Sequence, residues 1–181
     1  MEPLNETIQD RIVRIAKSYE GQEEIRENQG FKDPVFDAKM RKIGFQNGWA
    51  WCALFAKLIW MEAYAPYPEL LSQIIHNCSP SALGTLHNWL QNSGDFVFSK
   101  EPAIGAICIW QEGNTGFSGH AAICIGLMTE VNYFSTMEGN TNTDGSREGY
   151  ESAEKKRLLS FTNDPNKLNL KGFILPAPIP A

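Results

Sequence analysis

The chain has 181 residues, of which 16 are basic and 21 acidic, so its net charge at neutral pH is -5. Hydrophobic residues make up 43% and charged residues 20%, which is ordinary globular usage and excludes a disordered chain or a coiled coil. The length predicts one domain. Binding to nucleic acid through phosphate neutralisation is excluded, because the densest basic run is only Lys155-Lys156-Arg157.

The first residues, Met1 to Glu6, have neither the basic start nor the apolar core of a Sec signal peptide. No apolar run reaches the length of about 18 residues that a membrane-spanning helix needs. We therefore expect a protein that is made in the cytoplasm without a Sec signal and does not bind membranes. Action outside the cytoplasm would need another route of release or injection.

Four cysteines are present. No two of them form a C-x-x-C pair, and the histidines do not lie at the sequence spacing from them that is typical of zinc sites. They are Cys52, Cys78, Cys108 and Cys124. Reduced thiols are the expected state without a secretion signal, and two disulfides are the minor alternative.

The first part of the chain is predicted to be helical and then irregular. Residues 5–19 place apolar side chains such as Ile8 and Ile12 on one face of a helix that Asn5 would cap. Residues 21–47 are polar and mixed, with a short helix expected at 35–42.

A buried helix is predicted next. Residues 48–64 are apolar almost all round, and the prolines at 66 and 68 end the pattern. A short helix at 69–76 follows. The Ser79-Pro80 pair then has the sequence of a cap and first-turn proline for a helix that ends near Asn92.

After Pro102 the pattern changes from helix to strand. Five strands are expected, separated by segments rich in Gly, Asn, Asp and Ser. They are Ile104 to Trp110, His120 to Met128, Val131 to Glu138, Lys155 to Phe161 and Leu168 to Leu175. Helices first and strands second predict an α+β fold.

Cys52 lies at the beginning of the buried helix. A thiol at a helix N-terminus has a lowered pKa, and the free backbone amides there can hold an oxyanion. The alternative is a cysteine that only packs in the core.

His120 begins an apolar strand after a glycine-rich loop, and a strand holds an imidazole rigidly enough for a general base. A structural histidine at a strand end is the alternative. His76 and His87 lie on predicted helices among polar neighbours, so we expect ordinary surface or capping residues there.

Glu138 and Asn140 end the next strand, two residues apart and therefore on one face. A two-residue connection at 129–130 would place Gly139 opposite His120, whereas a three-residue connection at 128–130 would place Glu138 there. Glu138 and Asn140 thus lie beside the imidazole only with an odd connection or a β-bulge. A solvent-facing glutamate at a sheet edge is the alternative.

A cysteine on a helix N-terminus, followed by a histidine on a strand and a polar residue on the next strand, is the order of papain-type enzymes. The local strings are more specific than this order. They are Gly48-Trp49-Ala50-Trp51-Cys52-Ala53-Leu54-Phe55, the segment Ser81 to Trp89, Pro102-Ala103-Ile104-Gly105-Ala106-Ile107, Gly119-His120-Ala121-Ala122-Ile123, Glu138-Gly139-Asn140-Thr141 and Lys171-Gly172-Phe173-Ile174. In this order and over about residues 45–175, they resemble the CHAP domains, the cysteine, histidine-dependent amidohydrolases/peptidases.

The resemblance implies a papain-like α+β fold with N-terminal helices packed on an antiparallel sheet of about five strands. The catalytic domain would cover residues 46–176. Residues 1–45 would form an extension packed on it, and residues 177–181 a proline-rich tail.

The same resemblance implies that Cys52 is the nucleophile, His120 the base, Glu138 the residue that orients it and Asn140 a fourth polar member. Some phage members of the family bind calcium through aspartates on either side of the cysteine. Here Asp33 and Asp37 are not clustered and Leu54 follows the cysteine, so no metal or other cofactor is expected.

The implied activity is cleavage of an amide bond in bacterial peptidoglycan, by an amidase or a peptidase. Trp49, Trp51 and Phe117 are candidates to line the substrate groove, with core packing the alternative for Trp51, and Asn47 is a candidate helper at the oxyanion.

A phage lysin and an injected effector both fit the lack of a Sec signal, and an effector would also have a delivery or immunity protein as partner. We expect a monomer. The rival functions are a non-catalytic module of the same fold that binds wall fragments or a partner, and a cytosolic thiol hydrolase or acyltransferase that acts on a small amide.

Overall fold

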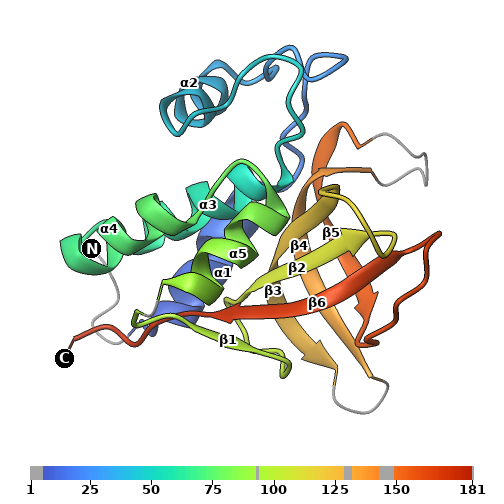
Figure 1. Cartoon of the computed structure of the whole chain (residues 1–181). Helices are drawn as coiled ribbons and strands as arrows, with labels where there is room; N and C mark the ends of the chain where they lie inside the picture. Colours follow the sequence, from blue (N-terminus) through green and yellow to red (C-terminus); the bar gives the residue numbers. More distant parts are fainter. Residues whose placement is uncertain (1–5, 93, 129–131, 143–148, 181) are drawn as a thin grey trace.

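The computed structural model describes residues 6–92, 94–128, 132–142 and 149–180. Within these residues, five helices precede six strands along the chain (Figure 1). The helices are α1 (Ile8–Ser18), α2 (Pro34–Lys42), α3 (Cys52–Ala63), α4 (Pro68–Asn77) and α5 (Ala82–Gln91). The strands are β1 (Val97–Ser99), β2 (Ile107–Glu112), β3 (Gly119–Met128), β4 (Tyr133–Thr141), β5 (Glu151–Leu158) and β6 (Leu168–Leu175). The α+β class predicted from the order of elements is confirmed.

The strands form one antiparallel sheet in the order β1-β6-β2-β3-β4-β5. The sheet is strongly curved, and α1, α3, α4 and α5 lie together on one side of it, while α2 lies apart beyond one end (Figure 1). The larger hydrophobic core lies between the helices and the face of the sheet that they cover. A smaller second core fills the opposite face, where Trp110, Phe134 and Phe173 are buried.

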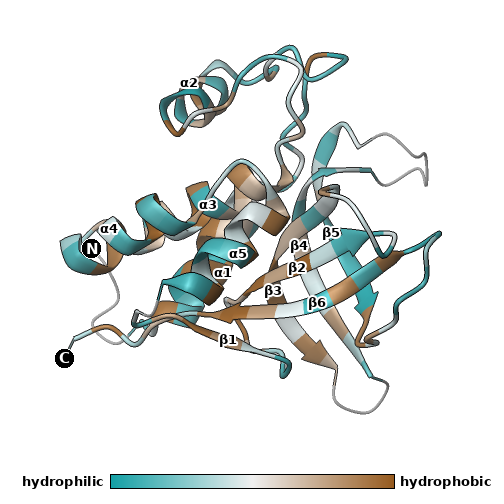
Figure 2. Ribbon diagram, in the orientation of Figure 1, coloured by the Kyte–Doolittle hydropathy of each residue, from teal (hydrophilic) through white to brown (hydrophobic). Residues whose placement is uncertain are grey.

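The hydropathy of the residues agrees with this arrangement of helices and sheet. The outward side of α4 is largely hydrophilic, whereas hydrophobic residues occupy the middle of the sheet (Figure 2). The α3 helix is buried on almost all sides, as its apolar sequence predicts. Among the described residues, no helix combines the length and the hydropathy that crossing a membrane requires.

Two predicted caps are corrected by the structure. Thr7 is the N-cap of α1, because its Oγ1 accepts a hydrogen bond from the amide of Asp10 at 3.1 Å. Asn5, the expected cap, lies outside the described residues. Helix α5 begins after Ser81, whose Oγ accepts from the amide of Gly84 at 3.1 Å. Ser79 does not cap it, because its hydroxyl accepts from the amide of Ser81 instead.

The strand predictions differ from the structure mainly at their ends. The short β1 strand was not predicted, since three residues are too few to show an alternating pattern. β5 begins at Glu151 rather than Lys155, because its polar first residues pair with the buried β4. β2 begins at Ile107, after Gly105 turns the chain with a φ of +84°. The start predicted for the third strand, Val131, lies outside the described residues.

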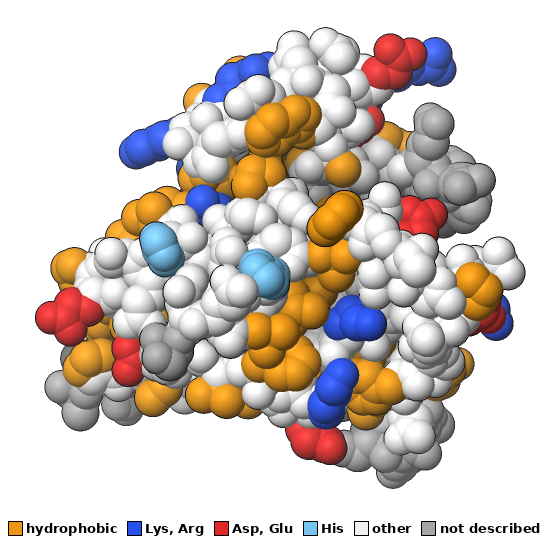
Figure 3. Space-filling view, viewed as in Figure 1, with side chains coloured by type: hydrophobic (Ala, Val, Ile, Leu, Met, Phe, Trp, Pro, Cys, Tyr) orange, Lys and Arg blue, Asp and Glu red, His pale blue; other side chains and the backbone are white. Residues whose placement is uncertain are grey.

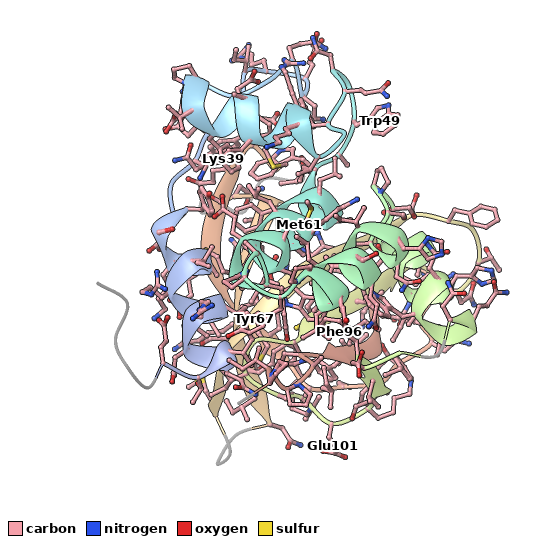
Figure 4. The ribbon with its side chains drawn as sticks, turned by 90° about the vertical axis from the view of Figure 1, so that its left-hand side faces the viewer. Lys39, Trp49, Met61, Tyr67, Phe96 and Glu101 are labelled. Carbon is pink, nitrogen blue, oxygen red and sulfur yellow. The ribbon has the colours of Figure 1, made fainter. Side chains whose placement is uncertain are left out.

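The N-terminal segment packs on the rest of the molecule. Ile12, Phe36 and Met40 from α1 and α2 belong to the larger core. Lys39 of α2 donates to Glu62 of α3 at 2.8 Å and lies on the side of α2 that faces the other helices (Figure 4). The backbone amide of Gly21 donates to the carbonyl of Ser152 at 2.8 Å, so the segment also extends along β5.

Candidate active site

Cys52 is the first residue of α3 and is 5% exposed. Trp51 occupies the N-cap position and makes no side-chain hydrogen bond to the helix end. Because the first amides of a helix have no partner within it, the amides at this end remain available to an anion. The backbone amides of Ala121 and Ala53 both donate toward the Cys52 sulfur.

His120 reaches the site from the second position of β3. Gly119 before it lies so close to neighbouring chain that an added Cβ would come within 2.4 Å of the Trp110 carbonyl oxygen and 3.3 Å of Leu83 Cγ on α5. Only glycine fits at this contact. It therefore sets His120 directly beside β2 and α5.

A β-bulge decides which face of β4 lies beside His120. Met128 pairs with Tyr133, so neither connection considered from the sequence gives the observed register. Continued without interruption, this register would place Gly139 on the same face as His120. The pairing shifts by one residue at Ile125, and Ile123 pairs with Met137 beyond it. Glu138 then shares the face of His120.

The structure brings the two side chains into contact. The Nε2 atom of His120 lies 2.8 Å from Oε2 of Glu138. The Nδ1 atom is therefore the ring nitrogen left for the Cys52 thiol, with which His120 also interacts by charge and hydrogen bonding. Cysteine, imidazole and carboxylate thus form a chain of three groups.

Glu138 is fully buried and has three further hydrogen bonds. Thr136 donates its hydroxyl to Oε1 at 2.6 Å, and Arg157 of β5 donates Nε to Oε1 at 2.6 Å and Nη2 to Oε2. Two carboxylate oxygens with this many donors are held in one orientation. Neither Thr136 nor Arg157 was singled out from the sequence. The available signal was alternation along β5, which places Arg157 and Lys155 on one face.

These contacts shift the pKa values of all three groups. Burial alone would raise the pKa of Cys52, but the charge of His120 and hydrogen bonds to the sulfur lower it below its ordinary value. Burial would likewise lower the pKa of His120, yet the charges of Glu138 and Cys52 raise it to about 10. Burial opposes ionisation of Glu138, and His120 and Arg157 overcome it, so its pKa is well below the usual range. The favoured state is thiolate, imidazolium and carboxylate.

Close packing fixes the distance between α3 and β4. A Cβ added to Gly139 would lie 2.5 Å from Cζ3 of Trp51 and 2.7 Å from Cβ of Phe55. Only glycine therefore allows β4 to lie this close to the beginning of α3. The glycine that follows Glu138 sets the separation between the carboxylate and the helix that carries Cys52.

Asn140 does not follow the alternation that the sequence suggested. Its φ is +55°, and the β4–β5 pairing is irregular between Glu138 and Thr141. Its Oδ1 is buried and has no hydrogen-bond partner within the described part of the chain. Its role as a fourth member of the site therefore stays a prediction.

The four candidate groove residues differ in exposure. Trp49 is 40% exposed, projects outward from the segment before α3 (Figure 4) and, with Ala50, Pro80 and Ser81, lines an open pocket of about 360 Å³. Phe117 is 90% exposed. Trp51 is fully buried and donates Nε1 to Glu24 at 2.8 Å, so its expected place in the groove is wrong and its alternative role in the core is correct. The Asn47 amide donates to Gln29 Oε1 at 3.2 Å.

The other cysteines are free thiols, as expected, and all three are buried. Burial raises the pKa of Cys78 to about 12 and raises that of Cys108 well above its ordinary value. A hydrogen bond from Cys108 lowers the pKa of Cys124, which is itself fully buried. His76 and His87 are exposed, and two histidine side chains lie on the surface over α4 and α5 (Figure 3).

Asp33 and Asp37, the two aspartates considered as calcium ligands, both accept hydrogen bonds from backbone amides. Asp33 caps α2 by accepting from the amides of Val35 and Phe36, and Asp37 accepts from the amide of Phe31 at 3.0 Å. In the described ranges, no three His, Cys, Asp or Glu side chains gather as metal ligands would.

Comparison with known proteins gives one match. No curated protein and no solved structure matches the chain significantly. The family model described as CHAP domain matches residues 44–140, which is more than half of the 181 residues and includes Cys52, His120 and Glu138. Membership supports a hydrolase of the amidase or peptidase kind with a peptidoglycan-related substrate. The chain belongs to the CHAP domain family.

Proposed function

We propose that this protein cleaves an amide bond of bacterial peptidoglycan, with Cys52 as nucleophile, His120 as acid and base, and Glu138 as the group that orients His120. The observation that carries the proposal is the contact of His120 Nε2 with Glu138 Oε2 at 2.8 Å, with Cys52 at the helix end beside the same imidazole. A buried thiol and imidazole with these pKa shifts form the activated pair of a thiol hydrolase.

In the proposed first step, the Cys52 thiolate attacks the carbonyl carbon, and the carbonyl electron pair moves to oxygen. Free amides at the beginning of α3 stabilise that oxyanion. The carbon–nitrogen bond then breaks as imidazolium gives its Nδ1 proton to the leaving amine, which leaves a thioester on Cys52. In the second step, neutral His120 takes a proton from water, the hydroxide attacks the thioester, and the acid product leaves with the thiolate restored.

The surface beside Cys52 supports a polymeric substrate over a small one. Trp49 and Phe117 are exposed aromatic side chains that precede Cys52 and His120 by three residues each. These two rings offer flat apolar surface to a substrate bound near Cys52 and His120. With a net charge of -5, attraction between opposite charges does not bring this protein to an anionic wall polymer. Substrate binding must therefore depend on shape and hydrogen bonds.

The proposal includes a place of action in the cell wall or periplasm, reached by release as a phage lysin or by injection as an effector. The test is digestion of purified peptidoglycan, followed by mass spectrometry of the soluble fragments. We expect wild-type protein to release fragments and Cys52→Ala to release none. A new free amino group on the L-alanine identifies an amidase, whereas new ends within the stem identify a peptidase. Turnover of soluble amides with no effect on peptidoglycan would overturn the proposal.

A further inference from the structure

We propose that Arg157 on β5 is a positioning residue of the active site, which holds the buried Glu138 carboxylate in place against His120. Arg157 lies beyond residue 140, where the family match ends. The inference rests on the proposed function of the same site, and it adds a group that does not touch the substrate.

The geometry is a two-point contact. Nε of Arg157 donates to Oε1 of Glu138 at 2.6 Å, while Nη2 donates to Oε2. A planar guanidinium that binds both oxygens fixes the plane of the carboxylate as well as its position. Because Oε2 is also the oxygen that faces His120 Nε2, rotation of the carboxylate would break the imidazole contact and the guanidinium contact together.

Packing holds the guanidinium itself in place. The Cζ atom of Arg157 lies 5.6 Å from the centre of the Trp110 ring. The centre of the His120 ring lies 5.8 Å from the centre of the same Trp110 ring. Trp110 is buried and stacks on Phe134 at 6.1 Å with an interplanar angle of 9°. Arg157 and His120 therefore contact one rigid indole from the second core. The Arg157 guanidinium is thus held in one position by its contacts, whereas a cation on a flexible surface side chain is not.

Charge balance predicts what Arg157 does for the nucleophile. The groups that face Glu138 are His120 from β3, Arg157 from β5, Thr136 from β4 and Cys108 from β2. With Cys52 ionised, the charges along the chain alternate between negative and positive and sum to zero. Without Arg157 the buried cluster carries one net negative charge, which protonation of Cys52 relieves.

The test measures the rate of Cys52 alkylation by iodoacetamide against pH, which needs no substrate. Arg157→Met is compared with Lys156→Met, which removes the same charge from an exposed neighbour on the same strand. We expect Arg157→Met to move the midpoint of alkylation upward by about one pH unit or more, in line with the effect of a nearby charge. Lys156→Met should leave it unchanged. Arg157→Lys keeps the charge without the two-point contact and should move it less.

Two further measurements separate positioning from a merely structural role. In the Glu138→Gln background, Arg157→Met should shift the midpoint much less, because the group it positions has lost its charge. On peptidoglycan, Arg157→Met should lower kcat about 10- to 100-fold with little change in KM, as loss of an outer supporting partner does. Circular dichroism and thermal melting of each variant show that it is folded.

Equal midpoints for Arg157→Met and Lys156→Met, in folded proteins, would overturn the proposal. So would an Arg157→Met shift of the same size in the presence and absence of the Glu138 charge. If wild-type protein does not cleave peptidoglycan but the alkylation shifts follow the expected order, the proposed substrate is wrong and the role of Arg157 stands.

Discussion

His120 and Glu138 meet across β3 and β4 only because Ile125 interrupts the pairing of the two strands. A bulge moves every later residue of a strand to the other face. Without the bulge, Glu138 would face α3 and Gly139 would face the imidazole of His120. The triad therefore depends on one backbone irregularity that lies five residues beyond His120 along β3.

Cys52 should be the only thiol that reacts near neutral pH. Its pKa is lowered by His120, while burial raises that of Cys78 to about 12. Cys108 and Cys124 are fully buried, so reagents cannot reach them. Iodoacetamide labelling with peptide mapping should find Cys52 labelled in the native protein and all four cysteines after unfolding. Cys52→Ala should lose at least about 10⁴-fold in kcat and Cys78→Ala little. Native labelling of Cys78 or Cys124 ahead of Cys52 would refute the assignment.

Glu138→Gln should lower kcat less than His120→Ala does. The amide can still face Nε2, so the base remains, but it no longer stabilises the imidazolium by charge. The matched control is Glu154→Gln on β5, an exposed carboxylate on the same sheet, which should keep wild-type kcat. Steady-state kinetics on peptidoglycan fragments provide the comparison. A larger loss in Glu138→Gln than in His120→Ala would contradict the orienting role.

The pH dependence of stability should report His120. Its pKa is raised in the folded protein to about 10, from an ordinary value of 6.5. Its contribution to the free energy of unfolding is thus complete below about pH 6.5 and disappears as the pH rises through the folded value. Glu138 contributes above its ordinary pKa of 4.5 and loses that contribution as the pH falls below it.

The His120 dependence is measured in the Cys52→Ala background, so that ionisation of the Cys52 thiol does not add a pH dependence of its own. The Tm difference between Cys52→Ala and Cys52→Ala with His120→Gln should be largest near pH 6 and should narrow by pH 10. Its midpoint should lie below the wild-type pKa of about 10, because the Cys52 charge no longer raises the pKa of His120. A difference that stays constant, or widens, over that range would show that His120 is not held as a cation in the folded protein.

Trp49 and Trp51 should respond to substitution in opposite ways. Trp49→Ala removes an exposed ring beside an open pocket, and it should raise KM for peptidoglycan with little change in Tm. Trp51→Phe removes the indole N–H that Glu24 accepts, which should cost about 1–3 kcal/mol of stability. Urea unfolding and steady-state kinetics on both variants test this pair. An unchanged KM in Trp49→Ala would remove that residue from the groove.

Salt should have little effect on activity. The protein carries a net charge of -5, and charges are screened over about 8–10 Å at moderate ionic strength. If binding depends on a short-range groove, hydrolysis of purified sacculi should stay constant or rise slightly from low to moderate sodium chloride. A steep fall would show that a local basic surface dominates binding, and the groove account would then fail.

The sequence by itself determined most of the helices and strands and their order, although it missed β1. The all-round apolar pattern of residues 48–64 predicts the buried α3, and its first helical residue is Cys52. Alternating and apolar runs predict β3 and β6 within a residue of their observed ends. These signals are local, because helix and strand periodicity is encoded in neighbouring residues. The motifs around Cys52, His120 and Glu138 likewise lie within short stretches of chain.

Only the tertiary structure decided which side chains meet. The face of Glu138 depends on the bulge at Ile125, and Arg157 reaches Glu138 because β5 pairs with β4. Trp49 and Trp51 have similar sequence surroundings, yet one is exposed and the other is covered by the N-terminal segment through Glu24. Register and burial result from pairing between residues distant in the chain. A pattern with a period of two residues leaves both faces possible until that pairing is fixed.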